Sequence, residues 1–403
     1  MTPLKGITVV DLSKVFAGPF CAQYLGDLGA DVIKVEPVES GDDTRSWEPQ
    51  QKGQSSPFLA FNRNKRSLAV NLKNEEGRAI VHSLVKQADV VVQGFKGGTA
   101  KQLGVDYETL KELNDQLIYC EISGFGLQGP LAGQPGYDVM LQAFSGMIST
   151  IGEPERPSVR VSFSPVDIGT GMLGLSGILA ALLERNQTGK GVFVELTLLD
   201  TAMAQMGYLF QNYWMTGEAP KPLGGGHGSL APYQAFSASD GELMVGAGND
   251  AQWQRLCSVL DLQDHADNPR FATNSARVTN KQDVARIVQQ VIGTEPVAHW
   301  LTAFDEAGIP CAPIHTLDQT SEHPQIAARD IVVQSDHPVL GPLNQIGFPI
   351  RFDGEPRPSP NPPPLLGEHS AEILTRIGFD ADAIADLTER GIVGCQNRES
   401  ADT

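Results

Sequence analysis

Cationic residues are scarce in this chain. Its 403 residues include 30 Lys and Arg against 48 Asp and Glu, which gives a net charge of −18. A surface of that sign repels phosphate backbones and anionic lipid headgroups. We therefore expect neither a nucleic-acid partner nor a membrane partner. Any local group of cations becomes a candidate site for a small polyanion.

Cysteine is also scarce, and its pattern excludes two kinds of site. The cysteines are odd in number, widely scattered and without a C-x-x-C pair: Cys21, Cys120, Cys257, Cys311 and Cys395. This pattern fits neither a disulfide framework nor a zinc site. Metal-ligand spacing is also missing among His227, His265, His315, His323 and His369. We expect no metal.

Long apolar runs are missing as well. The longest, from Gly174 to Leu183, is shorter than a membrane span. The first residues, MTPLKGITVVDLSK, lack the charged head, apolar run and cleavage site of a signal peptide. These features predict a cytoplasmic protein.

The chain does contain an alternation of β-branched runs and helical segments. The runs lie at residues 6–11, 31–36, 67–71, 89–93 and 117–122, with helical segments between them. Strands that alternate with helices favour an α/β fold with a doubly wound, mostly parallel, Rossmann-like sheet. A long apolar helix is predicted at 171–185, with a strand after it.

A second region begins after a break in this pattern. The Gly- and Pro-rich stretch EAPKPLGGGHG at 218–228 is typical of a linker or mobile loop. We expect residues 1–200 to form the first part of a large domain and 201–230 to be linker. Residues 231–315 are predicted to form a small α+β domain.

Asp167 stands in the segment SPVDIGTGM, immediately before the long apolar helix. Asp is a common N-cap residue, because its carboxylate accepts free backbone N–H groups. A helix N-terminus also stabilises a carboxylate anion and keeps it available as a nucleophile. The residues alone leave both interpretations open.

Three other segments are candidate sites, each with a structural alternative. The first β-α turn, at 14–19, occupies the place where doubly wound folds bind nucleotides, but it lacks G-x-G-x-x-G, and taken alone it is better explained as a plain structural turn. The basic stretch 62–67, followed by Lys73, Lys96 and Lys101, is either a phosphate site or a solvated rim. The glycines at 224–228 predict a lid or an ordinary linker.

Taken together, these segments resemble the class III coenzyme A transferases, the family of formyl-CoA transferase and carnitine CoA-transferase, from end to end. The resemblance is carried by PLKGITVVDLSKVFAGPFCAQYLGDLGADVIKVEP, FNRNKRSLAVNLK, ADVVVQGFKGG, GFGLQGPLAGQPGYDVMLQAFSG, VDIGTGM, GIPCAPI and PPPLLGEHS. It implies that Asp167 is the catalytic nucleophile. In the family's scheme this carboxylate attacks an acyl-CoA, and a mixed anhydride and an aspartyl-CoA thioester follow.

The resemblance also implies the ligands and the assembly. Acyl-CoA would be a substrate, with no permanently bound cofactor, and a free carboxylic acid would be the second substrate. The residues implied in CoA binding are Val15, Phe16, Ala17, Val70, Lys73, Phe95, Lys96 and Lys101. Substrate and loop roles fall on Tyr137, Gly225, Gly226 and His227. The family forms interlocked homodimers, in which residues 316–403 would return to the large domain.

The chain departs from the family pattern at several CoA-binding positions. Phe16 stands where formyl-CoA transferase has a glutamine, and Gln102 stands where it has an arginine. Gly94 and Lys96 replace an asparagine and an arginine, so an amide is lost and a bidentate guanidinium becomes a point charge. The phosphate contacts are therefore expected to be rearranged.

Two other functions compete with CoA transfer. The first is proton abstraction by an α-methylacyl-CoA racemase, in which a Gly-His-Asp motif supplies the base. Here that motif is Gly136-Tyr137-Asp138, and a tyrosine with a pKa near ~10 is a poor base at neutral pH. The second is a non-catalytic acyl-CoA binder, against which the intact Asp167 motif argues. Small dicarboxylic acids such as succinate are the expected substrates, with Arg160 either steering a second carboxylate or simply lying at the surface.

Overall fold

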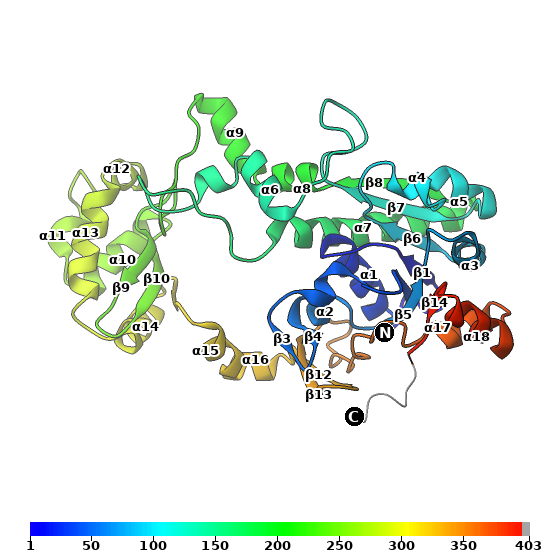
Figure 1. The fold of residues 1–403 in the computed structure, drawn as a ribbon. Coiled ribbons are helices and arrows are strands. Elements are labelled where there is room, and N and C mark those ends of the chain that lie inside the picture. The colour runs from blue at the N-terminus through cyan, green and yellow to red at the C-terminus, as the bar shows by residue number, and fades with distance from the viewer. Residues whose placement is uncertain (397–403) are drawn as a thin grey trace. The chain divides into compact units, whose positions relative to one another are not determined.

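The computed structural model describes residues 1–396, which fall into two compact units (Figure 1). Unit 1 contains Met1–Met147, Val161–Phe210 and the segment from Ala327 onward. Unit 2 contains Ile148–Arg160 and Gln211–Ile326. The chain therefore leaves unit 1 twice and returns to it twice, so N-terminal and C-terminal segments belong to one unit.

Unit 1 is built on a seven-stranded sheet with the order β14-β5-β2-β1-β6-β7-β8. Every neighbouring pair is parallel except β14 with β5. The strands are β1 (Thr8–Asp11), β2 (Asp31–Glu36), β5 (Lys65–Val70), β6 (Val90–Gln93), β7 (Ile118–Ser123), β8 (Val192–Thr197) and β14 (Val393–Gly394). This mixed α/β architecture agrees with the fold class predicted from the sequence.

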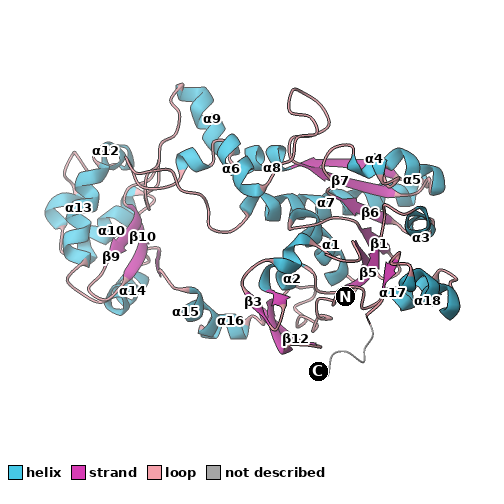
Figure 2. Cartoon of the chain, in the orientation of Figure 1, coloured by secondary structure: helices cyan, strands magenta, loops and turns pink. Residues whose placement is uncertain are grey.

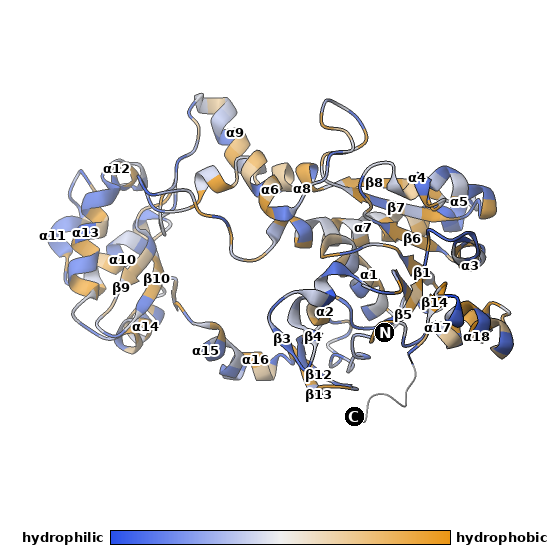
Figure 3. Cartoon of the chain, in the orientation of Figure 1, coloured by the Kyte–Doolittle hydropathy of each residue, from blue (hydrophilic) through white to orange (hydrophobic). Residues whose placement is uncertain are grey.

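Helices cover both faces of this sheet (Figure 2). One face carries α1 (Ala17–Asp27) and α7 (Pro165–Thr188), and the other carries α3 (Glu75–Val85), α5 (Tyr107–Leu113), α17 (Ser370–Arg376) and α18 (Ala381–Glu389). Strands buried on both faces read as continuous apolar runs. Val90, Val91 and Val92 of β6 are accordingly all fully buried, and the central strands are among the apolar parts of Figure 3.

Helix α7 is longer than the apolar run that the sequence analysis singled out. Its 24 residues are long and apolar enough to cross a membrane by length and composition alone. Half of its most apolar window is buried inside the protein, where α7 packs on α1, β7 and β8. Its apolar character is therefore explained by its place in the core.

Smaller elements of unit 1 surround the sheet. They are η1 (Asp43–Ser46), β3 (Gln50–Gln51), β4 (Gln54–Ser55), α2 (Ser56–Phe61), α4 (Thr99–Gln102), α6 (Asp138–Phe144), α8 (Leu198–Gln205), β12 (Val332–His337) and β13 (Gly341–Ile346). Two helices span the boundaries between units, α9 (Gly207–Thr216) and α16 (Pro324–Ala328). Helices α8 and α9 thus occupy much of the range that was predicted to be linker from residue 201.

Unit 2 holds a small antiparallel sheet with the order β11-β10-β9 and has its own core. Trp253, Phe304 and Val288 are fully buried there. Its elements are η2 (Ile148–Thr150), β9 (Tyr233–Ser237), β10 (Glu242–Gly246), α10 (Asp250–Val259), α11 (Gln263–Ala266), α12 (Asn274–Thr279), α13 (Lys281–Ile292), α14 (Val297–Glu306), β11 (Cys311–Pro313) and α15 (Leu317–Glu322). An α+β unit was expected from residue 231. The segment 148–160 belongs to it as well.

Candidate active site

The sheet order places a topological switch point between β1 and β6. From β1 the chain goes to β2 and β5 on one side, and it then crosses to β6, β7 and β8 on the other. In open α/β sheets, ligands bind outside the carboxyl ends of the strands at such a point. The segment that follows β1 carries Val15, Phe16 and Ala17. The segment that follows β6 carries Phe95 and Lys96. The fold therefore brings two groups of predicted CoA-binding residues to one edge of the sheet.

The first β-α turn has an unusual backbone conformation. Val15 has a φ of 70°, which is the left-handed region. For a β-branched residue this is a genuine outlier, and its cost is of order ~1–3 kcal/mol. The Val15 N–H donates to the carboxylate of Asp42, at 3.2 Å from Oδ1. Helix α1 begins directly after this turn, and no side chain caps its N-terminus at Phe16.

Two glycines let α7 approach α1 closely. A Cβ on Gly171 would lie 2.7 Å from the backbone oxygen of Ala17, and one on Gly174 would lie 3.1 Å from the sulfur of Cys21. Gly171 is four residues after Asp167, so the two share one face of α7. The start of α1 therefore lies against the helix face that carries Asp167.

Asp167 lies in the first turn of α7 and is not its N-cap. The N-cap position is Ser164, Pro165 and Val166 follow, and Asp167 is the third helical residue. Its side chain is 8% exposed. In the described part of the chain it has no cation as a hydrogen-bond or ion-pair partner. The interpretation of Asp167 as a simple cap is therefore wrong.

The cap is supplied by another carboxylate. Oδ2 of Asp138, the first residue of α6, accepts hydrogen bonds from the backbone N–H groups of Val166 at 2.8 Å and Asp167 at 3.0 Å. Its Oδ1 accepts from the amide of Gln142, whose oxygen in turn accepts from the N–H of Val161 at 3.0 Å. Asp138 thus ties α6 and the segment before α7 to the helix N-terminus.

This arrangement raises the pKa of Asp167 to about 7. Burial is the larger cause, because it disfavours the charged carboxylate, and the negative charge of Asp138 is the second. The expectation that the helix N-terminus would stabilise the anion of Asp167 is therefore wrong. Asp138 accepts from the N–H groups of Val166 and Asp167 instead, and Asp167 is left as a buried carboxyl group.

Glycine contacts also shape the loop between β7 and α6. A Cβ on Gly97 would lie 2.7 Å from Cα of Gly133, and one on Gly124 would lie 2.6 Å from the backbone nitrogen of Gly136. The loop after β7 therefore packs on the loop after β6 and delivers Tyr137 to the start of α6. The side chain of Tyr137 is 61% exposed, next in sequence to the buried Asp138.

The basic stretch at 62–67 is not a phosphate site. Lys65 is fully buried on Asp11, Arg63 pairs with Asp27, and Arg66 pairs with Asp31 and Glu372. These cations neutralise carboxylates within the fold, so the prediction that this stretch holds phosphates is wrong.

The remaining predicted cations have a different environment. Lys73, Lys96 and Lys101 are exposed, and Val70 is buried at the end of β5. Lys73 and Lys96 follow the carboxyl ends of β5 and β6, on the edge of the sheet where the switch point lies. Their predicted role in CoA binding stays a prediction.

Gly225, Gly226 and His227 lie in unit 2, within a turn that precedes β9. The N–H of Gly226 donates to the backbone oxygen of Leu223, and the N–H of His227 donates to that of Tyr233, both at 3.0 Å. The turn is thus held locally by backbone bonds. Its action as a lid over Asp167 stays a prediction.

No cluster of three His, Cys, Asp or Glu suited to a metal ion occurs within residues 1–396. All five cysteines are free thiols.

Comparison with known proteins identifies the family. The model of CoA-transferase family III matches residues 4–370. The chain belongs to this family. Like its family, this class III CoA-transferase takes acyl-CoA as a substrate.

Individual relatives agree with this assignment. The chain is 37% identical over 393 residues to succinyl-CoA:glutarate CoA-transferase of Homo sapiens, covering 97% of this chain and 90% of that protein. It is 39% identical over 387 residues to succinate–glutarate CoA-transferase of Agrobacterium fabrum, covering 93% and 96%. A crystal structure of a CAIB/BAIF family protein from Brucella suis matches with a TM-score of 0.84 and 38% identity, covering 93% and 99%.

Sequence reasoning missed two residues of this transferase that the structure brings forward. Asp138 was noted only as a neighbour of Tyr137, and Asp42 was not noted at all. Each is a carboxylate that accepts from backbone N–H groups at least 27 positions away. The only local signal was an acidic residue one or two positions after a glycine, GYD for Asp138 and SGDDTR for Asp42.

Proposed function

We propose that this transferase moves CoA from succinyl-CoA, or another small acyl-CoA, to a small dicarboxylic acid such as glutarate, with Asp167 as the covalent nucleophile. The substrate class is supported by the relatives that are named as succinyl-CoA:glutarate and succinate–glutarate CoA-transferases. The mechanism is supported by one observation above the others: Asp167 is a buried carboxyl group with a pKa raised to about 7, beside the switch point of the sheet.

The proposed reaction needs no reagent beyond the two substrates. A carboxylate oxygen of Asp167 attacks the thioester carbon, the C–S bond breaks, and CoA leaves as a thiolate. The thiolate then attacks the Asp167 carbonyl carbon of the mixed anhydride and releases the donor acid as a carboxylate. The acceptor carboxylate attacks the resulting aspartyl-CoA thioester, which expels CoA thiolate and forms a mixed anhydride of Asp167 with the acceptor. This thiolate then attacks the acceptor acyl carbon, which breaks the anhydride C–O bond, gives the acceptor acyl-CoA and frees the Asp167 carboxylate.

The environment of Asp167 suits both parts of this reaction. With a pKa of about 7, roughly half of the free enzyme carries the reactive carboxylate at neutral pH, and a more basic carboxylate is a stronger nucleophile. Its burial also limits the access of water, which would hydrolyse the anhydride and the thioester. A carboxylate in an ion pair would be a weaker nucleophile.

We also propose that the transferase is an interlocked homodimer. The support is a set of large apolar side chains exposed on α6 and α7 of unit 1: Met140, Phe144, Met172, Leu173 and Leu183. Exposed apolar groups of this size are typical of protein–protein interfaces. A cytoplasmic location, with the free cysteines kept reduced, completes the proposal.

A transfer assay with a matched variant tests the proposed function. Purified enzyme is mixed with succinyl-CoA and glutarate, and glutaryl-CoA is followed by chromatography. We expect transfer in the wild type and its loss in Asp167→Ala, without exchange of the α-proton of the acyl group. Asp115→Asn, at an exposed aspartate, is the control and should retain full activity.

A trapping experiment tests the covalent step directly. Incubation with succinyl-CoA, then hydroxylamine, should convert the Asp167 carboxyl group to a hydroxamate that is visible in the mass of its peptide. An active enzyme whose Asp167 stays unmodified would refute the mechanism. Failure with succinyl-CoA but trapping with another acyl-CoA would correct only the substrate.

A further inference from the structure

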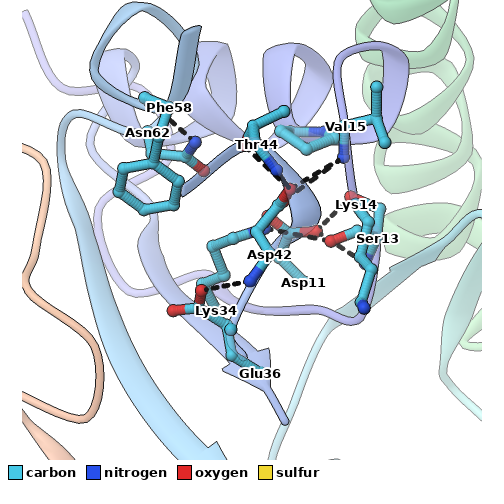
Figure 4. Close-up of polar contacts among 12 residues, drawn as sticks. Asp11, Ser13, Lys14, Val15, Lys34, Glu36, Asp42, Thr44, Phe58 and Asn62 are labelled. Atoms are coloured by element: carbon cyan, nitrogen blue, oxygen red, sulfur yellow. Dashed lines mark hydrogen bonds and ion pairs between the residues drawn. The ribbon is translucent and has the colours of Figure 1, made fainter. Parts of the chain in front are cut away.

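The first β-α turn is held from one side by a buried carboxylate and lysine (Figure 4). The N–H of Val15 donates to Asp42, at 3.2 Å from Oδ1 and 3.3 Å from Oδ2. Two residues earlier, the backbone oxygen of Ser13 accepts from Nζ of Lys34 at 3.0 Å. Lys34 and Asp42 form an ion pair at 2.9 Å, with both side chains fully buried. We name these two residues the turn clamp.

Asp42 has little freedom to move. Besides Lys34 and Val15, its carboxylate accepts from the N–H and the hydroxyl of Thr44 at 3.0 and 2.8 Å. Its own N–H donates to the carboxylate of Glu36 at 3.0 Å. Burial alone would raise the pKa of Asp42, but Lys34 and Thr44 outweigh it and lower the pKa to about 2. The clamp therefore stays charged over the whole working pH range.

The turn needs such a clamp because its backbone conformation is unfavourable. Val15 is β-branched and has a φ of 70°, a region that such residues avoid. This backbone persists only where the surroundings overdetermine it. The bond from the Val15 N–H to Asp42 is the contact that fixes the peptide in this orientation.

The clamp also reaches the groups on either side of the turn. Asp42 is the N-cap of η1, and Trp47 follows that helix with its ring 5.6 Å from the ring of Phe16, edge to face. Ala17, which follows Phe16 in the sequence, has its backbone oxygen against Gly171 of α7. A change in the conformation of the turn would therefore shift Phe16 and the start of α1.

We propose that Asp42, together with Lys34, is a positioning residue for acyl-CoA: it holds Val15 in the left-handed conformation and thereby presents the turn at residues 13–17 in the shape that receives CoA. This inference rests on the proposed function, because it assigns a substrate to the turn. Asp42 acts through the backbone of Val15 and takes no part in the bond exchange at Asp167.

A strain-relief experiment separates this role from general stability. In Asp42→Asn the charge is lost, and the neutral amide oxygen is a weaker acceptor for the Val15 N–H than the carboxylate. We therefore expect the KM for succinyl-CoA to rise about tenfold, equivalent to ~1.4 kcal/mol, while kcat changes by less than about threefold. Adding Val15→Gly should restore most of the KM, because glycine adopts a φ of 70° without a clamp. Glu39→Gln, at an exposed carboxylate nearby, is the matched control and should leave both constants unchanged.

A second variant covers the case in which Asp42→Asn does not fold. Val15→Pro keeps the buried pair of Lys34 and Asp42 but removes the N–H and forces a negative φ. It should also raise the KM for succinyl-CoA at least tenfold, and raise the Kd for CoA itself in calorimetry.

The outcomes distinguish this inference from the function on which it rests. An unchanged KM in folded Asp42→Asn or in Val15→Pro overturns the positioning role, as does a double variant that is no better than Asp42→Asn. Absence of CoA transfer in the wild type overturns the proposed function instead.

Discussion

Replacing Asp167 by asparagine should inactivate the transferase and yet stabilise its fold at alkaline pH. In the folded enzyme the pKa of Asp167 is about 7, against an ordinary value of 3.8 for this side chain. The unfolded chain therefore loses this proton near pH 4, while the folded enzyme keeps it until about pH 7. Unfolding releases a proton between these values, so the contribution of Asp167 to stability falls as the pH rises through this window.

The size of the effect follows from the same two values. A difference of about 3 pKa units at 1.36 kcal/mol each sets an upper bound of about 4 kcal/mol above pH 7, and relaxation of the site brings the expected value to about 2–4 kcal/mol. A neutral asparagine escapes this cost. The advantage of Asp167→Asn over the wild type should be near zero at pH 3, reach at most about 1 kcal/mol at pH 4.5, grow up to pH 7 and level off above it.

Urea unfolding of the wild type and Asp167→Asn, followed by fluorescence at a series of pH values, measures this difference. Asp115→Asn, which removes an exposed carboxylate, is the control and should show no such pH-dependent gain. A stability difference that does not change between pH 4.5 and 8 would refute the raised pKa. If the stability gained by Asp167→Asn became smaller as the pH rises, the pKa of Asp167 would be lowered in the folded enzyme and not raised.

Two further predictions concern the neighbours of Asp167. Asp138→Asn removes the charge that helps to raise the pKa of Asp167, so the acidic limb of the profile of kcat/KM against pH should move below 7; a limb that stays in place would contradict the coupling. Gly171→Ala places a methyl group 2.7 Å from the backbone oxygen of Ala17, so α1 or α7 must shift, and we expect a loss of about 1–3 kcal/mol in thermal or urea unfolding. On the same helix Gly177→Ala meets only the side chain of Val194 at 3.2 Å and should be nearly neutral, and equal losses for both variants would argue against the contact between α1 and α7.

The alternation of strands and helices in unit 1 was predictable because each element carries its own pattern. The run at 31–36 is β2 residue for residue, the run at 89–93 begins one residue before β6, and the run at 117–122 begins and ends one residue before β7. These strands are buried on both faces, so their apolar signal is continuous. Helix α9 lies in the predicted linker range and has no buried residue, although its sequence GYLFQNYWMT is largely apolar.

The candidate site was less predictable because its decisive contacts are remote in sequence. A local reading of Asp167 could not show that Asp138, 29 residues earlier, occupies the N–H groups of the same helix. The prediction of a phosphate site at 62–67 was wrong for the same reason, because the carboxylates that neutralise Arg63 and Lys65 lie on α1 and β1. Family resemblance located Asp167 as the candidate nucleophile, whereas the structure shows that its carboxyl group is buried and that its pKa is raised.

The cap that Asp138 provides changes the electrostatic balance of the proposed reaction cycle. The free enzyme is the state in which two neighbouring carboxylates oppose each other. Once Asp167 is acylated or bound to CoA as a thioester, its negative charge is gone, and Asp138 is the one carboxylate of the pair that remains at the N-terminus of α7. Each covalent intermediate of the proposed cycle thus lacks the negative charge of Asp167. The repulsion that disfavours the resting carboxylate would therefore favour the acylated states of the proposed cycle.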